Sequence, residues 1–209
     1  MSETKQGEER AIIETVLRYC DNGGTHLQPD VMQIPVTEYT DPERLNREIE
    51  VLFRQFPIIV GHASALAAPG DFFTHNSTGV PMLIARNRVG EVKAFLNVCR
   101  HRGARVEQQP CGKANTFSCP YHSWTYDLDG NLRGLPKDTN FGDIDKSELG
   151  LVALPAFERF GLIWVRPSPS SAPVDIDAWV APMAEQLESL DLKSHVVFKE
   201  WAVKREMNW

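Results

Sequence analysis

Two short segments near the middle of the chain each place a cysteine close to a histidine, and this pairing constrains the fold more than any other feature. One residue separates Cys99 from His101, and two separate Cys119 from His122, which gives the pattern C-x-H-x17-C-x2-H. The chain has four cysteines, and two of them paired with histidines favour a metal site over a disulfide framework. The fold therefore has to bring two separate segments together at one metal centre.

One thiolate and one imidazole from each segment suit a two-iron centre. In a Rieske-type [2Fe–2S] cluster, two cysteines hold one iron and two histidines hold the other. The predicted cofactor and metal ligands are Cys99, His101, Cys119 and His122. Gly103 would let the first ligand loop turn tightly. A zinc site is the chemical alternative, but zinc fingers pair cysteine with cysteine and histidine with histidine.

The region around the motif has the pattern of a small all-β domain. From Ile58 to Val165, short runs rich in Val, Ile, Phe and Thr are separated by Gly, Pro, Asn and Asp, which is typical of strands and turns. Residues 87–91 and 127–131 read as hairpin turns. The predicted strands are 58–62, 71–76, 81–87, 92–98, 115–118, 123–127 and 161–165.

Helical patterns precede this region. Residues 9–20 and 41–54 carry apolar residues at helical spacing. The second helix is expected to bury a stripe made of Leu45, Ile49, Leu52 and Phe53.

The region after the β domain contains three parts. The Pro- and Ser-rich residues 166–173 read as a linker. A helix is predicted within 177–190, with a short turn near Pro182 before it. Residues 196–209 read as a long strand, and because a domain rarely ends in an unpaired strand, we expect a longer polypeptide.

Charge and hydropathy exclude several classes of function. The net charge of −6 gives no indication of a nucleic-acid or anionic-membrane surface. No run reaches the roughly 18 apolar residues that a membrane span needs. The N-terminal sequence is too polar for a signal peptide, so the expected compartment is the cytoplasm.

The two ligand segments, read with their neighbours, resemble a known family. CRHRG at 99–103 and CPYHSWTYDLDGNLRGLP at 119–136 are similar to the Rieske domain of the alpha subunits of ring-hydroxylating oxygenases, the Rieske non-heme iron oxygenases. The resemblance implies a mainly β (α+β) fold: a Rieske-type antiparallel β-sandwich with N-terminal helices, a C-terminal helix and the first strand of a missing catalytic domain. The expected parts are a helical lead-in over 1–54, the [2Fe–2S] domain over 55–165, and a linker, helix and start of the catalytic domain over 166–209.

The resemblance also implies a function. The chain would pass single electrons from a reductase or ferredoxin, supplied by NAD(P)H, to a mononuclear Fe(II) that activates O₂ to hydroxylate or demethylate an organic, often aromatic, substrate. Members of the family form trimers, in some cases with a beta subunit. The alternative is a stand-alone electron carrier similar to Rieske ferredoxins, which would need only about residues 57–165.

The second iron is not expected within these 209 residues. It is held by two histidines and a carboxylate, and the remaining histidines show no suitable spacing. These are His26, His62, His75 and His195. No catalytic residue is therefore predicted here, and this chain alone is not expected to turn over substrate.

Features beside the ligands bear on donor binding and potential. Arg100, Arg102 and Arg105 form a basic rim, read either as solvated loop charge or as a docking site for an acidic electron donor. By resemblance, Trp124 stands where high-potential Rieske proteins carry a hydrogen-bonding serine, and Tyr121 where they carry a disulfide cysteine. Fewer hydrogen bonds to the sulfurs imply a low potential.

Overall fold

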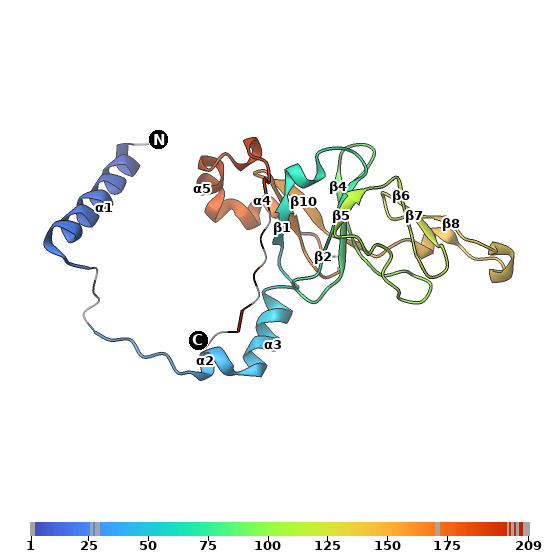
Figure 1. Ribbon diagram of the computed structural model, residues 1–209, viewed down its shortest axis with the longest axis horizontal. Helices are drawn as coiled ribbons and strands as arrows, with labels where there is room; N and C mark the ends of the chain where they lie inside the picture. The colour runs from blue at the N-terminus through green and yellow to red at the C-terminus, as the bar shows by residue number, and fades with distance from the viewer. Residues whose placement is uncertain are drawn as a thin grey trace. The chain divides into compact units, whose positions relative to one another are not determined.

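The computed structural model describes residues 3–25, 27, 30–169, 172–199, 201, 203 and 205–206. The chain (Figure 1) forms two compact units, Met1–Asp41 and Pro42–Trp209. His26 and the final Met207-Asn208-Trp209 lie outside the described residues.

The first unit contains two helices. Helix α1 spans Glu3–Asn22, so it includes the predicted helix at 9–20 and begins earlier. Helix α2 is a single turn at Thr37–Thr40. The apolar side chains of α1 are more than half exposed, namely Ile12, Ile13, Val16 and Leu17.

The second unit begins with helix α3, Pro42–Val51, which confirms the predicted helix at 41–54. Its expected burial was wrong. Leu45, Leu52 and Phe53 each remain about half exposed, because helical spacing identifies an apolar face without supplying the surface that would cover it.

A five-stranded antiparallel sheet, ordered β5-β2-β3-β4-β9, forms the centre of the second unit. Its strands are β2 (Asp71–His75), β3 (Met82–Arg86), β4 (Val92–Leu96), β5 (Cys111–Lys113) and β9 (Ala153–Leu154). The predicted turn at 87–91 joins β3 to β4, with Met82 opposite Leu96 and Arg86 opposite Val92.

Two smaller sheets accompany the central one. The first is antiparallel and ordered β1-β11-β10, with β1 at Ile58–His62, β10 at Ala156–Arg159 and β11 at Leu162–Val165. The second is ordered β6-β7-β8, with β6 at Thr116–Ser118, β7 at Thr125–Asp127 and β8 at Leu132–Gly134. The predicted turn at 127–131 joins β7 to β8.

Strand β3 is buried on both faces because it lies between these two sheets. Successive side chains of a strand point to opposite faces. Leu83 and Ala85 therefore pack with Phe117 of β6, while Met82 and Ile84 pack with Ile163 of β11. The result is the expected sandwich of antiparallel sheets, and the mainly β prediction is confirmed.

The helices after the sheets cover the remaining face of the β1-β11-β10 sheet. Helix α4 spans Ile176–Val180, a 3₁₀ turn follows at Ala181–Met183, and α5 spans Ala184–Ser189. Ile176 and Val180 pack against Trp164. The predicted turn near Pro182 is confirmed.

The predicted strand at 196–209 is wrong for the residues that can be described. From Val196 to Glu206 these residues are assigned to no strand. A strand needs a hydrogen-bonded neighbour, and the backbone N–H of Val197 instead donates to the side-chain Oγ of Ser64 at 3.0 Å. Among the described helices, none is long and apolar enough to cross a membrane.

Candidate functional site

The two segments singled out by their cysteine–histidine pairs form loops of the same construction. In the first, the backbone N–H of Cys99 donates to the Ala104 carbonyl at 2.8 Å, and that of Gly103 donates back to the Cys99 carbonyl at 2.9 Å. In the second, Cys119 donates to Trp124 at 2.8 Å and Ser123 donates back to Cys119 at 2.9 Å. Each loop therefore places a cysteine at its entrance and a histidine at its tip.

The residue four positions after each cysteine has left-handed backbone. The first loop uses Gly103, with φ of 75°, as expected for a tight turn. The second uses Ser123, with φ of 59°. The same turn is therefore closed once by glycine and once by a residue with a side chain.

The two thiols are buried and lie beside one another. Cys99 and Cys119 belong to the core formed between the central sheet and the β6-β7-β8 sheet. Burial raises the pKa of the Cys99 thiol, and neighbouring Cys119 acts in the same direction. Two buried thiolates this close need a cation to balance their charge, which is what an iron ion would provide.

The two imidazoles are partly buried and in contact. The ring centroids of His101 and His122 lie 4.6 Å apart, with the planes inclined at 68°. Desolvation lowers the pKa of His101, and the positive charges of His122 and Arg102 add to this effect. A lowered pKa favours the neutral imidazole, which is the form that binds metals.

One nitrogen of His101 has no hydrogen-bond partner. Its Nδ1 atom is buried and unpaired, although buried polar atoms are normally satisfied. A metal ion at this position would remove the cost of that unpaired acceptor. The donor atoms and their surroundings therefore fit a [2Fe–2S] cluster.

The side chains form one pair of thiols and one pair of imidazoles, and not a single group of ligands around one metal ion. Within the described part of the chain, no three His, Cys, Asp or Glu side chains converge as one metal ion would require. In a Rieske centre each iron takes two protein ligands, as one thiol pair beside one imidazole pair can supply.

A fifth residue, which the sequence analysis did not predict, also contacts the site. The Tyr126 hydroxyl oxygen lies 3.3 Å from Cys99 Sγ and accepts the backbone N–H of Arg100 at 3.1 Å. Burial and the neighbouring Cys99 raise the pKa of Tyr126, so its hydroxyl keeps its proton. The hydroxyl can therefore donate to the sulfur while its oxygen accepts from Arg100.

Aromatic rings line the histidines. The indole of Trp124 stacks on His101 with centroids 4.9 Å apart and planes 7° apart. The ring of Tyr121 lies 4.0 Å from that of His122. Arg100, Arg102 and Arg105 are exposed around the first loop, where the sequence predicted a basic rim.

The other three histidines that the structure describes make contacts of their own. His62 contacts Ser64 Oγ through Nδ1 and the Leu192 carbonyl through Nε2, both at 2.8 Å. His75 contacts Ser77 Oγ through Nε2 at 3.0 Å, while its Nδ1 is buried and, like that of His101, has no partner. His195 contacts the Asp191 carbonyl at 3.0 Å. These contacts are made with residues outside the two ligand loops.

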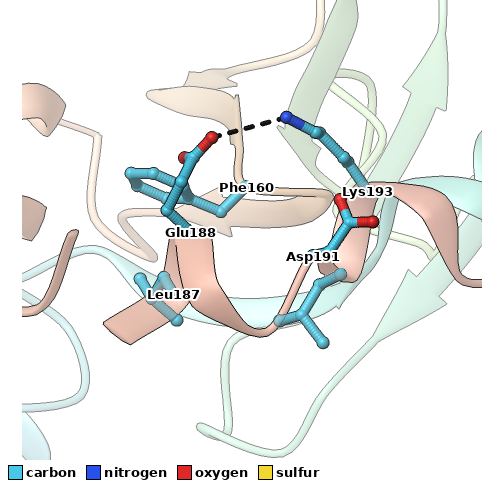
Figure 2. A pocket seen from close by; sticks show the side chains of 6 residues that line it. Phe160, Leu187, Glu188, Asp191 and Lys193 are labelled. Atoms are coloured by element: carbon cyan, nitrogen blue, oxygen red, sulfur yellow. Dashed lines mark hydrogen bonds and ion pairs between the residues drawn. The ribbon is translucent and has the colours of Figure 1, made fainter. Parts of the chain in front are cut away.

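A small hollow at the other end of the unit is also separate from the cluster site. It has a volume of about 10 Å³ and lies between the β10–β11 turn and the C-terminal helices, lined by Phe160 and Leu187 among others (Figure 2). Glu188 and Lys193 form an ion pair of 3.4 Å across it. It is too small for an organic substrate.

Comparison with known proteins agrees with this geometry. Residues 56–157 match the family model described as "Rieske [2Fe-2S] domain". The chain is 33% identical over 177 residues to the glycine betaine monooxygenase oxygenase subunit of Pseudomonas aeruginosa PAO1, covering 84% of this chain and 40% of the relative. It is 29% identical over 178 residues to the benzene 1,2-dioxygenase subunit alpha of Pseudomonas putida, covering 82% and 39%.

Solved structures give the same result. The apo form of the quaternary ammonium Rieske monooxygenase CntA superposes with a TM-score of 0.70 at 30% identity, covering 77% of this chain and 47% of that one. Naphthalene 1,2-dioxygenase from Rhodococcus sp., with indole bound, superposes with a TM-score of 0.66 at 29% identity, covering 72% and 34%. The chain spans about 40% of the length of the curated relatives.

Proposed function

We propose that this chain, a member of the Rieske oxygenase alpha-subunit family, relays single electrons within such an oxygenase. The premise is that residues 56–157 are a Rieske [2Fe–2S] domain and that the chain is homologous to the N-terminal part of those subunits. The observation that carries the proposal is the pair of equally built loops, with the thiol of Cys99 beside that of Cys119 and the imidazole of His101 against that of His122.

In the proposed centre, Cys99 and Cys119 hold one iron, and His101 and His122 hold the other. We assign the buried, unpartnered Nδ1 of His101 to its iron, so that the proton of this neutral imidazole stays on Nε2. When bound, the cluster supplies one-electron oxidation and reduction. Tyr126 donates its hydroxyl proton to Cys99 Sγ, and Trp124 covers one face of His101.

The electron donor is proposed to be a reductase, a ferredoxin, or both in series. Exposed Arg100, Arg102 and Arg105 give the first ligand loop a positive edge. Opposite charges on two proteins speed their encounter and orient it. An acidic donor surface would therefore meet the chain at the loop that carries His101.

The whole oxygenase is proposed to use these electrons at a second iron. That mononuclear Fe(II) would lie in a catalytic domain following this chain, and the substrate would be an organic molecule that is hydroxylated or demethylated. We further propose a cytoplasmic homotrimer, with or without a beta subunit, and domain boundaries at 54/55 and 165/166.

The decisive experiment is metal analysis followed by redox titration of the purified chain. Two irons and two acid-labile sulfides per chain are expected, with the uptake of one electron from dithionite. One zinc and no sulfide would refute the cluster. With reductase, NADH and O₂ supplied, the chain should accept electrons and leave candidate aromatic or quaternary-ammonium substrates unchanged, and product formation would overturn the assignment of catalysis to another domain.

A further inference from the structure

The two histidines of the site have unequal surroundings. His101 has the face of Trp124 on one side, and the ring of Phe141 lies edge-on with centroids 5.9 Å apart and planes at 78°. His122 has Tyr121 beside it, and that ring is 61% exposed. Both histidines are partly exposed, and the ring of His101 has one more aromatic neighbour than that of His122.

Phe141 reaches His101 from the connection between β8 and β9. It ends a 3₁₀ turn at Asp138–Phe141. The residues on either side of this turn, Lys137 and Gly142, both have left-handed backbone, with φ of 57° and 66°. Two such residues bracket the turn and fix the direction in which the chain enters and leaves it.

The same connection is attached to the core and closed on itself. Ile144 and Leu149 pack against the core that contains the two cysteines. The ammonium of Lys146 pairs with Asp138 at 3.3 Å. These contacts hold the connection against the domain. They help to fix the position of Phe141 in addition to the contacts of its own ring.

Phe141 is not placed as an ordinary core residue. Its side chain is 38% exposed, and the ring contacts found for it are with His101 and with Trp124, at 5.8 Å and 74°. A phenylalanine recruited for core stability would be more deeply buried. Its ring instead lies against the partly exposed imidazole of His101.

Water at this imidazole would affect the two redox states differently. In an oxidised Rieske centre with neutral imidazoles, the thiolates and sulfides balance the ferric ions, and the added electron makes the centre an anion. Water stabilises the anion more than the neutral form, and solvent exposure is one determinant of cluster potential. A hydrophobic cover therefore disfavours reduction.

We propose that Phe141 is a positioning residue that holds the His101 ring against Trp124 and excludes water from it, and thereby keeps the reduction potential of the cluster low. This inference rests on the proposed function, since it requires the cluster to be present. It assigns to the β8–β9 connection a role in setting the potential.

The test compares Phe141→Ala with Phe141→Leu in the cluster-loaded chain. Alanine admits water and should raise the midpoint potential, with about a tenfold change in the equilibrium constant for reduction, or about 59 mV for one electron. Leucine keeps an apolar cover and should retain most of the wild-type potential. Phe198→Ala is the control, because Phe198 is 98% exposed and has no part in the ligand loops.

Each outcome is informative. An Ala variant with full iron and sulfide and an unchanged or lower potential overturns the inference and leaves the proposed function standing. Loss of the cluster from the wild-type chain would instead refute the proposed function. If the Ala variant fails to assemble a cluster, Phe141→Gln is compared with Phe141→Leu: a higher potential for Gln supports the shield, and equal potentials refute it. Loss of the cluster from Leu as well would overturn it, because Phe141 would then be part of the fold alone.

Discussion

The hydroxyl oxygen of Tyr126 lies 3.3 Å from the sulfur of Cys99, although the two residues are 27 positions apart in the chain. Strand β7 carries the tyrosine beneath the first ligand loop, where the same oxygen accepts the Arg100 N–H. A hydrogen bond to a ligand sulfur stabilises the more electron-rich, reduced state of a cluster. We therefore expect Tyr126 and Phe141 to act on the potential in opposite directions.

We predict that Tyr126→Phe lowers the midpoint potential. The loss of about 1 kcal/mol of hydrogen bonding that favours the reduced state corresponds to roughly 40 mV. Redox titration of the loaded chain measures this shift. Tyr121→Phe is the matched control, because it removes the hydroxyl of an exposed tyrosine in the other ligand loop. A potential that rises in Tyr126→Phe would show that the hydroxyl does not donate to the sulfur.

We predict that Cys99→Ser and Cys119→Ser each abolish the cluster and reduce the thermal stability of the β domain. A bound group that links two loops stabilises the folded state, and its loss removes that contribution. Iron and sulfide content and the melting temperature are the measurements. Cys111→Ser is the control, since Cys111 is an exposed free thiol on β5. Equal iron and sulfide in wild type and either ligand variant would refute the ligand assignment.

Asp127 should make the stability of the β7–β8 hairpin depend on pH. Burial acts to raise its pKa, but hydrogen bonds from Asn131, Arg133 and Asp129 outweigh burial and lower it. A lowered carboxyl pKa means that the folded state favours the ionised form. Its stabilisation is therefore present above the ordinary carboxyl range near pH 4 and is lost as the pH falls through the lowered value.

The corresponding experiment is urea unfolding of Asp127→Asn and wild type at pH 7 and at about pH 3. At pH 7 the variant should be less stable by about 1 kcal/mol, since its hydrogen bonds no longer end on a charge. The difference should shrink at the lower pH. Asp143→Asn, a change at an exposed carboxylate, should show little effect at either pH. A gap that is constant or widens on acidification would contradict the argument.

Gly161→Ala should destabilise the junction between the β10–β11 turn and the C-terminal segment. Gly161 has φ of +76°, and an added Cβ would lie 2.6 Å from the backbone nitrogen of Lys193. Strain and clash together should cost about 3 kcal/mol. Gly90→Ala isolates the strain alone, because Gly90 has φ of +88° and open space around it. Denaturant midpoints that shift equally in both variants would show that the backbone contact is unimportant.

The longer strands and the two main hairpins could be predicted because each carries its own pattern. Strand β3 lies within the predicted 81–87, and its turn chemistry at 87–91 is local. Strands β5, β8, β9 and β10 were missed. Cys111–Lys113 has a glycine at its centre, and Ala153–Leu154 has two residues. Such segments are strands because a neighbour pairs with them, and the neighbour cannot be read from the segment itself.

The same limit applies to the site. The spacing of cysteines and histidines singled out four residues, and the fold places Cys99 beside Cys119 and His101 against His122. Tyr126 and Phe141 reach the site across the fold, so no local pattern predicts their contacts. The burial expected for Leu45 and Phe53 failed for the same reason, because it depends on a covering surface and not on helical spacing.

The hydrogen bonds that close the two ligand loops run between backbone atoms and involve no ligand side chain. Each loop can therefore keep its shape before any iron binds. The free energy of folding the adjoining sheets offsets the conformational entropy lost when the loop is ordered. The folded chain without iron would then already hold both ligand loops in their closed conformation. We therefore expect backbone amide exchange of Gly103 and Ser123 to be slow already in the iron-free chain.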